Sequence, residues 1–149
     1  MTSWWRPDRF AQKREKLEAR ARILAALRGY FADQDFIEVD TPALQATPGP
    51  DPHIHAFATT YELPHGGQRP LWLQASPELS CKKLLTAGME RIYQLSHVFR
   101  NREGSSRHQP EFMLLEWYRT GAGYRELMDD CMALLRAALE MAGADEFSF

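Results

Sequence analysis

The sequence predicts an α+β fold, in which an antiparallel sheet is flanked by helices. Two segments with helical periodicity stand near the two ends of the chain, at about 7–33 and from Tyr124 onward. Between them lie segments whose side chains alternate with a period of two, which is typical of strands. The last two of these, 91–100 and 111–119, are separated only by a polar loop. A strand–loop–strand unit of this kind forms an antiparallel hairpin.

Composition supports a globular protein. The chain has 149 residues, of which 44% are hydrophobic and 26% charged, so disordered, collagen-like and disulfide-stapled classes are excluded. The net charge of −2 excludes an overall basic field for nonspecific nucleic-acid binding. Cys81 and Cys131 lie far apart and are interpreted as two buried thiols in a reducing cytosol. No apolar run is long enough for a membrane span or a signal peptide, so we expect a cytoplasmic protein with no membrane partner.

The first element is a helix over 7–33. Its apolar positions share one face, and its basic positions form a second face that suits either solvent or RNA. We expect the helix to stop near 33–35, because Asp tolerates the left-handed conformation that helix ends often need. A short strand over 36–40 follows, and Pro42 marks its end because proline cannot donate to a sheet.

The middle of the chain alternates loops and strands. Prolines and a glycine make 46–53 a loop, and strands are predicted over 57–63 and 71–75, with a turn at 64–70. His53 and His55 form an HxH pair, but no cysteine or third histidine lies nearby. The two histidines are therefore interpreted as loop residues, and no metal site is predicted.

Two further helices are expected. Ser76, Pro77 and Glu78 form a good helix start, with serine as N-cap and proline in the first turn, and this helix should end near Gly88. The segment 121–125 is interpreted as a turn before the last amphipathic helix, which begins at Tyr124.

The chemistry concentrates in 98–119. In the strand 111–119, side chains alternate, so Glu116 shares a largely apolar face with Phe112, Leu114 and Tyr118. A buried carboxylate is costly unless it meets a cation. That cation is either a structural partner, for which Arg100 is the candidate, or the ammonium group of a ligand.

The loop between the two strands is basic. Arg100, Arg102, Arg107 and His108 fall within nine residues, which suits phosphate or carboxylate binding but also fits an exposed polar turn. Glu78 has the same ambiguity, because an acid in the first turn of a helix also complements the helix dipole.

Three segments together resemble a known family. FIEVDTPAL resembles motif 1 of class II aminoacyl-tRNA synthetases, FRNREGSSRHQPEF with LLEWYR resembles motif 2 of their lysyl branch, and SPELSCKKLL resembles the segment between. The resemblance covers roughly 20–139. Within that branch, LEWYR and the short segment before motif 1 look most like the elongation factor P–(R)-β-lysine ligases. Lysyl-tRNA synthetases carry an OB-fold anticodon domain there, so we expect no anticodon-binding domain and no tRNA anticodon contact.

The resemblance implies a ligase. Such enzymes use ATP, with Mg²⁺ on the nucleotide, to convert lysine or (R)-β-lysine to an aminoacyl-adenylate, and then acylate a lysine of elongation factor P. Arg100 would be the catalytic residue that holds the substrate carboxylate and the α-phosphate. The other ATP-binding positions would be Asn101, Arg102, Glu103, His108, Gln109 and Phe112. Substrate would contact Ser76, Pro77, Glu78, Glu116 and Tyr118. Pro42 would lie at a homodimer interface.

The sequence also departs from the family pattern. Arg102 stands where the family has a glutamate, with Glu103 one place later, and Gln109 replaces the usual asparagine. Motif 3, which carries an ATP-clamping arginine, is absent, so we expect 1–149 to be the N-terminal part of a catalytic domain and catalytically incomplete alone. Two alternatives stay open: a fragment of a tRNA-charging lysyl-tRNA synthetase, and a non-catalytic module for binding or dimerisation.

Overall fold

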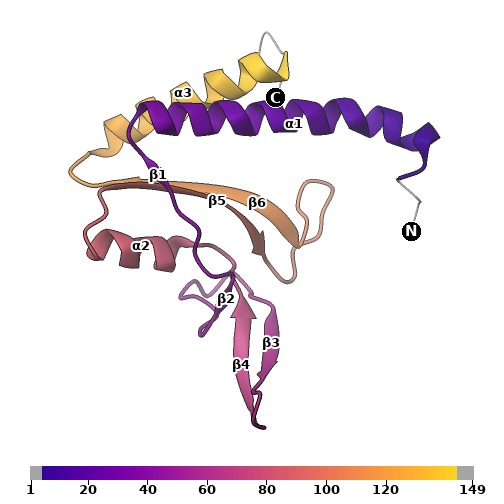
Figure 1. The fold of residues 1–149 in the computed structure, drawn as a ribbon, viewed down its shortest axis with the longest axis vertical. Helices are drawn as coiled ribbons and strands as arrows, with labels where there is room; N and C mark the ends of the chain where they lie inside the picture. The colour runs from indigo at the N-terminus through magenta and orange to yellow at the C-terminus, as the bar shows by residue number, and fades with distance from the viewer. Residues whose placement is uncertain (1–4, 144–149) are drawn as a thin grey trace. The chain divides into compact units, whose positions relative to one another are not determined.

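A computed structural model describes residues 5–143 (Figure 1). Its elements are α1 (Pro7–Asp33), β1 (Ile37–Glu38), β2 (Leu44–Gln45), β3 (Ala58–Glu62), β4 (Gln68–Leu73), α2 (Glu78–Thr86), β5 (Arg91–Phe99), β6 (Glu111–Arg119) and α3 (Tyr124–Ala142). The chain divides into two compact units. One contains the residues up to Phe36 and those from Gly121, and the other is 37–120. The element order confirms the predicted α+β class.

The first unit is built from α1 and α3. The Tyr30 hydroxyl donates a 2.5 Å hydrogen bond to Oδ1 of Asp130, which is only 2% exposed. Phe31 is fully buried and packs edge-to-face on Phe36, with ring centres 5.1 Å apart. After α1 the backbone reverses at Asp35, whose φ of 58° is the left-handed conformation expected at this helix end.

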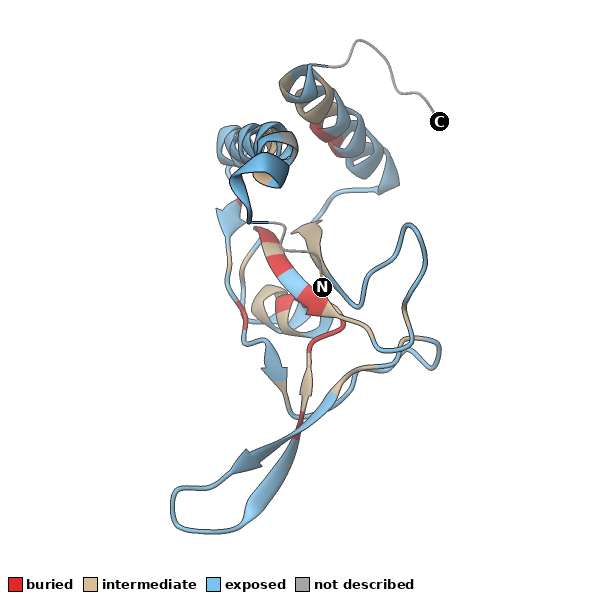
Figure 2. Cartoon of the chain, turned by 90° about the vertical axis from the view of Figure 1, so that its right-hand side faces the viewer, coloured by how far each residue is buried: buried red, intermediate tan, exposed pale blue. Residues whose placement is uncertain are grey.

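The second unit contains the sheet β1–β5–β6. Strands β5 and β6 pair antiparallel from Arg91↔Arg119 to Phe99↔Glu111, which confirms the predicted hairpin. Strand β1 is shorter than the predicted 36–40 and pairs in parallel with β5. Figure 2 shows buried segments along β5, which lies between two hydrogen-bonded neighbours. The middle of this sheet therefore carries the core of the unit.

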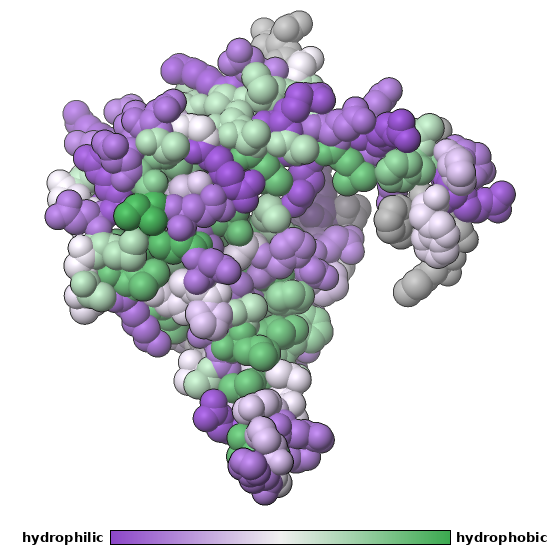
Figure 3. All heavy atoms as spheres, in the orientation of Figure 1, coloured by the Kyte–Doolittle hydropathy of each residue, from purple (hydrophilic) through white to green (hydrophobic). Residues whose placement is uncertain are grey.

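A second, smaller sheet has the order β2–β4–β3. Strand β4 begins at Gln68, within the predicted turn, and includes Pro70. Pro70 is tolerated because β2 pairs only with Trp72 and Leu73, which leaves β4 with an unpaired side at the proline. The β3–β4 hairpin is exposed along β3 and hydrophilic at its tip, at the lower end of the molecule in Figure 3. The sequence analysis did not predict β2.

Helix α2 lies against the β1–β5–β6 sheet. Cys81 of α2 is fully buried, and its Sγ lies 3.6 Å from Oε1 of Gln94 on β5. The helix ends before Gly88, whose φ of 106° permits the chain to reverse. Within residues 5–143, no helix combines the length and apolar character that crossing a membrane requires.

Candidate active site

One face of the β5–β6 hairpin carries two of the five predicted substrate residues, Glu116 and Tyr118. Residues directly opposite in an antiparallel pair project to the same side. The register sets Tyr118 opposite Ile92 and Glu116 opposite Gln94. Ile92 and Gln94 are buried, so the Glu116 carboxylate stands on the buried side of the sheet, as the alternation predicted.

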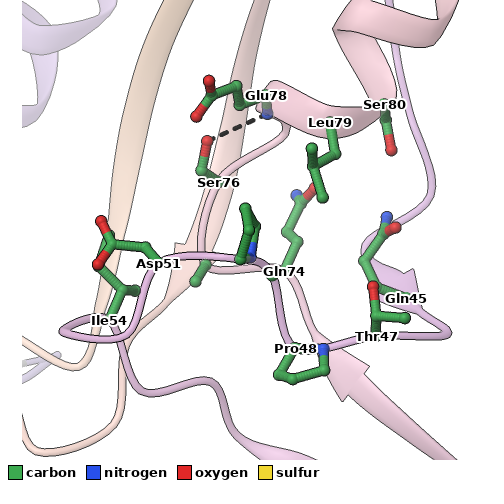
Figure 4. Close-up of a pocket in the computed structure, with 13 residues that line it drawn as sticks. Gln45, Thr47, Pro48, Asp51, Ile54, Gln74, Ser76, Glu78, Leu79 and Ser80 are labelled. Carbon is green, nitrogen blue, oxygen red and sulfur yellow. Dashed lines mark hydrogen bonds between the residues drawn. The ribbon is translucent and has the colours of Figure 1, made fainter.

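Ser76 connects the start of α2 to β6. Its hydroxyl donates a 2.8 Å hydrogen bond to Oε1 of Glu116 and accepts the Glu78 backbone N–H at 3.1 Å. Figure 4 shows the second contact at the start of the helix. Helix α2 begins at Glu78, and its N-cap residue is Pro77 rather than the predicted Ser76. Ser76 lies one residue before the N-cap, and its hydroxyl still accepts the first N–H of the helix. The same hydroxyl thus links the backbone at the start of α2 to the Glu116 carboxylate of β6.

The second oxygen of Glu116 is the unusual atom. Oε2 is buried and has no hydrogen-bond partner among residues 5–143. Burial raises the pKa of this carboxyl, and the charge of Glu78 raises it further. Hydrogen bonding to Ser76 and Tyr118 and the charge of Arg100 lower the pKa, without reversing the upward shift. This carboxylate therefore lies in surroundings that favour an arriving cation.

Two neighbouring groups are also perturbed. Burial, followed by the charge of Glu116, raises the pKa of the Tyr118 hydroxyl, so Tyr118 stays protonated. Burial and the charge of Glu116 raise the pKa of the Cys81 thiol to about 11. Both groups remain neutral at physiological pH, and neither supplies the missing positive charge.

Arg100 is near the site but does not neutralise Glu116. Its Nε donates a 3.1 Å hydrogen bond to the Ala75 carbonyl, and its guanidinium carbon lies 5.1 Å from the centre of the Phe112 ring. In the part of the chain that the structure describes, Arg100 and Glu116 form no ion pair, which disfavours the structural-partner interpretation. Only Nε donates a side-chain hydrogen bond there, so the two terminal nitrogens remain available for a carboxylate or a phosphate.

The predicted ATP-binding residues of the loop bond mainly to the loop itself. Asn101 accepts the Arg102 backbone N–H through its side chain, and its own N–H donates to the His55 carbonyl at 2.6 Å. Arg102 has a φ of 64°, a conformation that is uncommon outside glycine. His108 contacts the Ser105 hydroxyl at 3.0 Å. The structure does not bring these residues, or Glu103 and Gln109, against Glu116.

A cavity of about 90 Å³ adjoins the Ser76–Glu78 segment. Its lining includes the start of α2 and the loop that contains Thr47 and Asp51 (Figure 4). Gln74 also lines it, is 4% exposed, and has a side-chain oxygen without a hydrogen-bond partner in the described residues. Sequence reasoning treated this loop only as a connection; its dense Pro/Gly composition was the available signal.

Pro42, the predicted interface residue, lies elsewhere in the unit. It lines a shallow open depression together with Leu95, His97 and Phe99 of β5. Its side chain is exposed, and the Gln45 side chain donates a hydrogen bond to its carbonyl. The structure therefore places Pro42 at an accessible surface, apart from the Ser76–Glu116 contact.

Comparison with known proteins identifies the family of the chain. Residues 5–147 match the family model described as "tRNA synthetases class II (D, K and N)". The chain therefore belongs to the class II tRNA synthetase family.

Its similar curated relatives carry a more specific name. The proteins from Vibrio campbellii, Vibrio atlanticus and Pasteurella multocida are each named elongation factor P–(R)-β-lysine ligase, at 37%, 40% and 41% identity. The matches cover all of this chain and 46% of each Vibrio protein, and 91% of this chain and 42% of the Pasteurella protein. The chain thus spans about half the length of the curated relatives it matches, and the resemblance to this ligase group is confirmed.

Proposed function

We propose that this chain carries the amino-acid-binding residues and the catalytic arginine, Arg100, of an ATP-dependent elongation factor P–(R)-β-lysine ligase. The observation that supports this most strongly is the Glu116 carboxylate. The Glu116 side chain is half-buried, its Oε2 is buried without a partner among the described residues, and burial raises its pKa. A site of this kind suits a ligand that brings its own positive charge.

The ligand that fits best is a diamino acid. Glu78 lies close enough to Glu116 for its charge to raise the pKa of that carboxyl, although the Glu78 carboxylate also pairs with Lys82 one turn along α2. The two acids would together form a negative site for amines. Lysine or (R)-β-lysine has two ammonium groups for such a pocket. Glu78 and Glu116 would bind the amine near the carboxylate of the substrate, and Tyr118 would lie near the terminal ammonium.

The reaction begins with adenylate formation. A carboxylate oxygen of the amino acid attacks the α-phosphorus of ATP, the new P–O bond forms, and pyrophosphate leaves. Arg100 would hold the attacking carboxylate and the α-phosphate together, which lowers the barrier by positioning and by charge neutralisation. Phe112 would stack on adenine, His108 would contact the outer phosphates, and Mg²⁺ would be bound mainly by phosphate oxygens.

Transfer completes the reaction. The side-chain amine of a lysine on elongation factor P attacks the acyl carbon, and AMP leaves with the electrons of the broken C–O bond. We propose that the enzyme acts in the cytoplasm as a homodimer, with Pro42 at the subunit interface. The exposed depression around Pro42 and β5 supports that placement.

Amine binding tests the proposal. We expect isothermal titration calorimetry to detect lysine or (R)-β-lysine binding to the chain, and Glu116→Gln to weaken that binding at least about tenfold because it removes a desolvated charge. Glu111→Gln is the matched control, since Glu111 is exposed at the start of β6 and pairs with His97. Equal affinities for Glu116→Gln and the parent chain would contradict the proposed role.

A further inference from the structure

Gln94 has a buried side-chain amide whose oxygen is hydrogen-bonded and whose nitrogen, within residues 5–143, is not. It lies in the middle of β5 and is 1% exposed. Its Oε1 accepts a 3.0 Å hydrogen bond from the Thr41 hydroxyl and a 3.6 Å contact from the Cys81 thiol. The protonated thiol is a donor, so both contacts assign the oxygen to this side of the amide. The Nε2 group therefore points away from Thr41 and Cys81.

Two orphaned atoms of complementary type then occur on neighbouring strands. Nε2 of Gln94 is buried without a partner in the described part of the chain, and so is Oε2 of Glu116. Gln94 and Glu116 are directly opposite each other in the β5–β6 register. A buried donor and a buried acceptor are each costly when unsatisfied, and buried polar groups are nearly always paired. No direct hydrogen bond joins the two atoms, and a bridging water can satisfy a donor and an acceptor placed in this way.

We propose that Gln94 is a positioning residue that holds Oε2 of Glu116 through one buried water. The water bridge itself does not depend on the proposed function. Only its expected effect on amine binding rests on that function. The resulting chain of hydrogen bonds runs from Thr41 through Gln94 and the water to Glu116 and then Ser76. It fixes the orientation of the carboxylate before a cation arrives. The conformational entropy lost on binding is therefore smaller.

Contact with Gln94 is limited to the Cys81 thiol among the described titratable groups around Glu116. Glu78, Arg100, Tyr118 and Cys81 are the titratable groups that interact electrostatically with it. They come from α2 and its surroundings, from the end of β5 and from β6 itself. Removing the Gln94 amide also removes its contacts with Thr41 and Cys81, so the test compares a change at position 94 with a change at Thr41.

The experiment measures the pKa of Glu116 by NMR in chain labelled at the glutamate carboxyl carbon, with Glu116→Gln to assign the signal. We expect Gln94→Met, which keeps the length but removes the amide, to raise that pKa by about one unit. Thr41→Val should raise it less, because the amide stays but loses its anchor. Thr60→Val, on the exposed strand β3, is the control and should leave the pKa unchanged.

A pKa of Glu116 that is unchanged in Gln94→Met overturns the proposal. If Gln94→Met does not fold, Thr41→Val decides instead: a rise supports the bridge and no rise overturns it. Calorimetry with (R)-β-lysine separates this inference from the proposed function. Should Gln94→Met shift the pKa while Glu116→Gln binds the amine as the parent does, the bridge is supported and the amine-binding role is wrong.

Discussion

The guanidinium of Arg100 lies over the ring of Phe112, with 5.1 Å between the guanidinium carbon and the ring centre. The Ala75 carbonyl fixes the same side chain through Nε. A long cationic side chain loses considerable freedom when it binds a phosphate. Here two contacts restrict Arg100 in advance, and its charge acts on the Glu116 carboxyl. This arrangement is the structural basis for expecting adenylate chemistry at this site.

The raised pKa of Glu116 predicts how stability depends on pH. Because the folded protein binds this proton more tightly than the unfolded chain, the contribution of Glu116 to stability is greatest below the ordinary carboxyl range. It falls as the pH rises through the raised pKa. Glu116→Gln removes this loss, so its melting temperature should exceed that of the parent by a few degrees at pH 7.

Thermal unfolding followed by circular dichroism from pH 3 to pH 8 measures this effect. The melting temperatures of the parent and Glu116→Gln should approach each other at the acidic end. Glu62→Gln, on the exposed strand β3, should follow the parent throughout. Parallel curves for the parent and Glu116→Gln would show that burial does not perturb this carboxyl.

The two cysteines should differ in reactivity. Cys81 is fully buried, as the sequence predicted, and its pKa is raised to about 11. The prediction of a buried thiol is wrong for Cys131, which is exposed on α3. The thiolate is the reactive form, so a thiol reagent at pH 8 should modify Cys131 and spare Cys81. Mass spectrometry should find one label on the native chain and two after denaturation. Rapid labelling of Cys81 in the native chain would contradict the packing of α2 on β5.

The Tyr30–Asp130 hydrogen bond should stabilise the α1–α3 unit. Tyr30→Phe leaves the nearly buried Asp130 with one donor fewer. We expect a loss of about 1.5–3 kcal/mol in the free energy of unfolding, the usual range for a hydrogen bond to a charged group. Urea denaturation measures it. Tyr61→Phe, in the exposed strand β3, is the control and should change stability little.

Much of the fold could be predicted because its signals are local. The helical period of 7–33, the alternation of 91–100 and 111–119, and the left-handed residue at Asp35 each depend on residues close in sequence. The sequence did not predict strand β2 or the early start of β4, because both depend on hydrogen bonds to other strands. Leu44 and Gln45 carry no strand pattern of their own, and Pro70 suggests a turn until the unpaired side of β4 is known.

The candidate site was predictable only in part. Alternation identified Glu116 as a costly carboxylate, and the family resemblance added Ser76 and Glu78. The sequence could not show that Ser76 bonds Glu116, because 40 residues separate them. The same limit hid Gln94, whose role depends on the strand register.

The most direct test of the central claim is ATP–pyrophosphate exchange with (R)-β-lysine. The protein to use is a chimera in which 1–149 is joined to the part of the Vibrio campbellii relative that this chain does not match. We predict amino-acid-dependent exchange, which Arg100→Ala lowers about 10²–10³-fold and Arg100→Lys hardly restores. Arg102→Ala should be milder, because Arg102 departs from the family pattern. A folded chimera in which Arg100→Ala exchanges as fast as the parent, or in which Arg102→Ala is the more damaging change, would contradict the account.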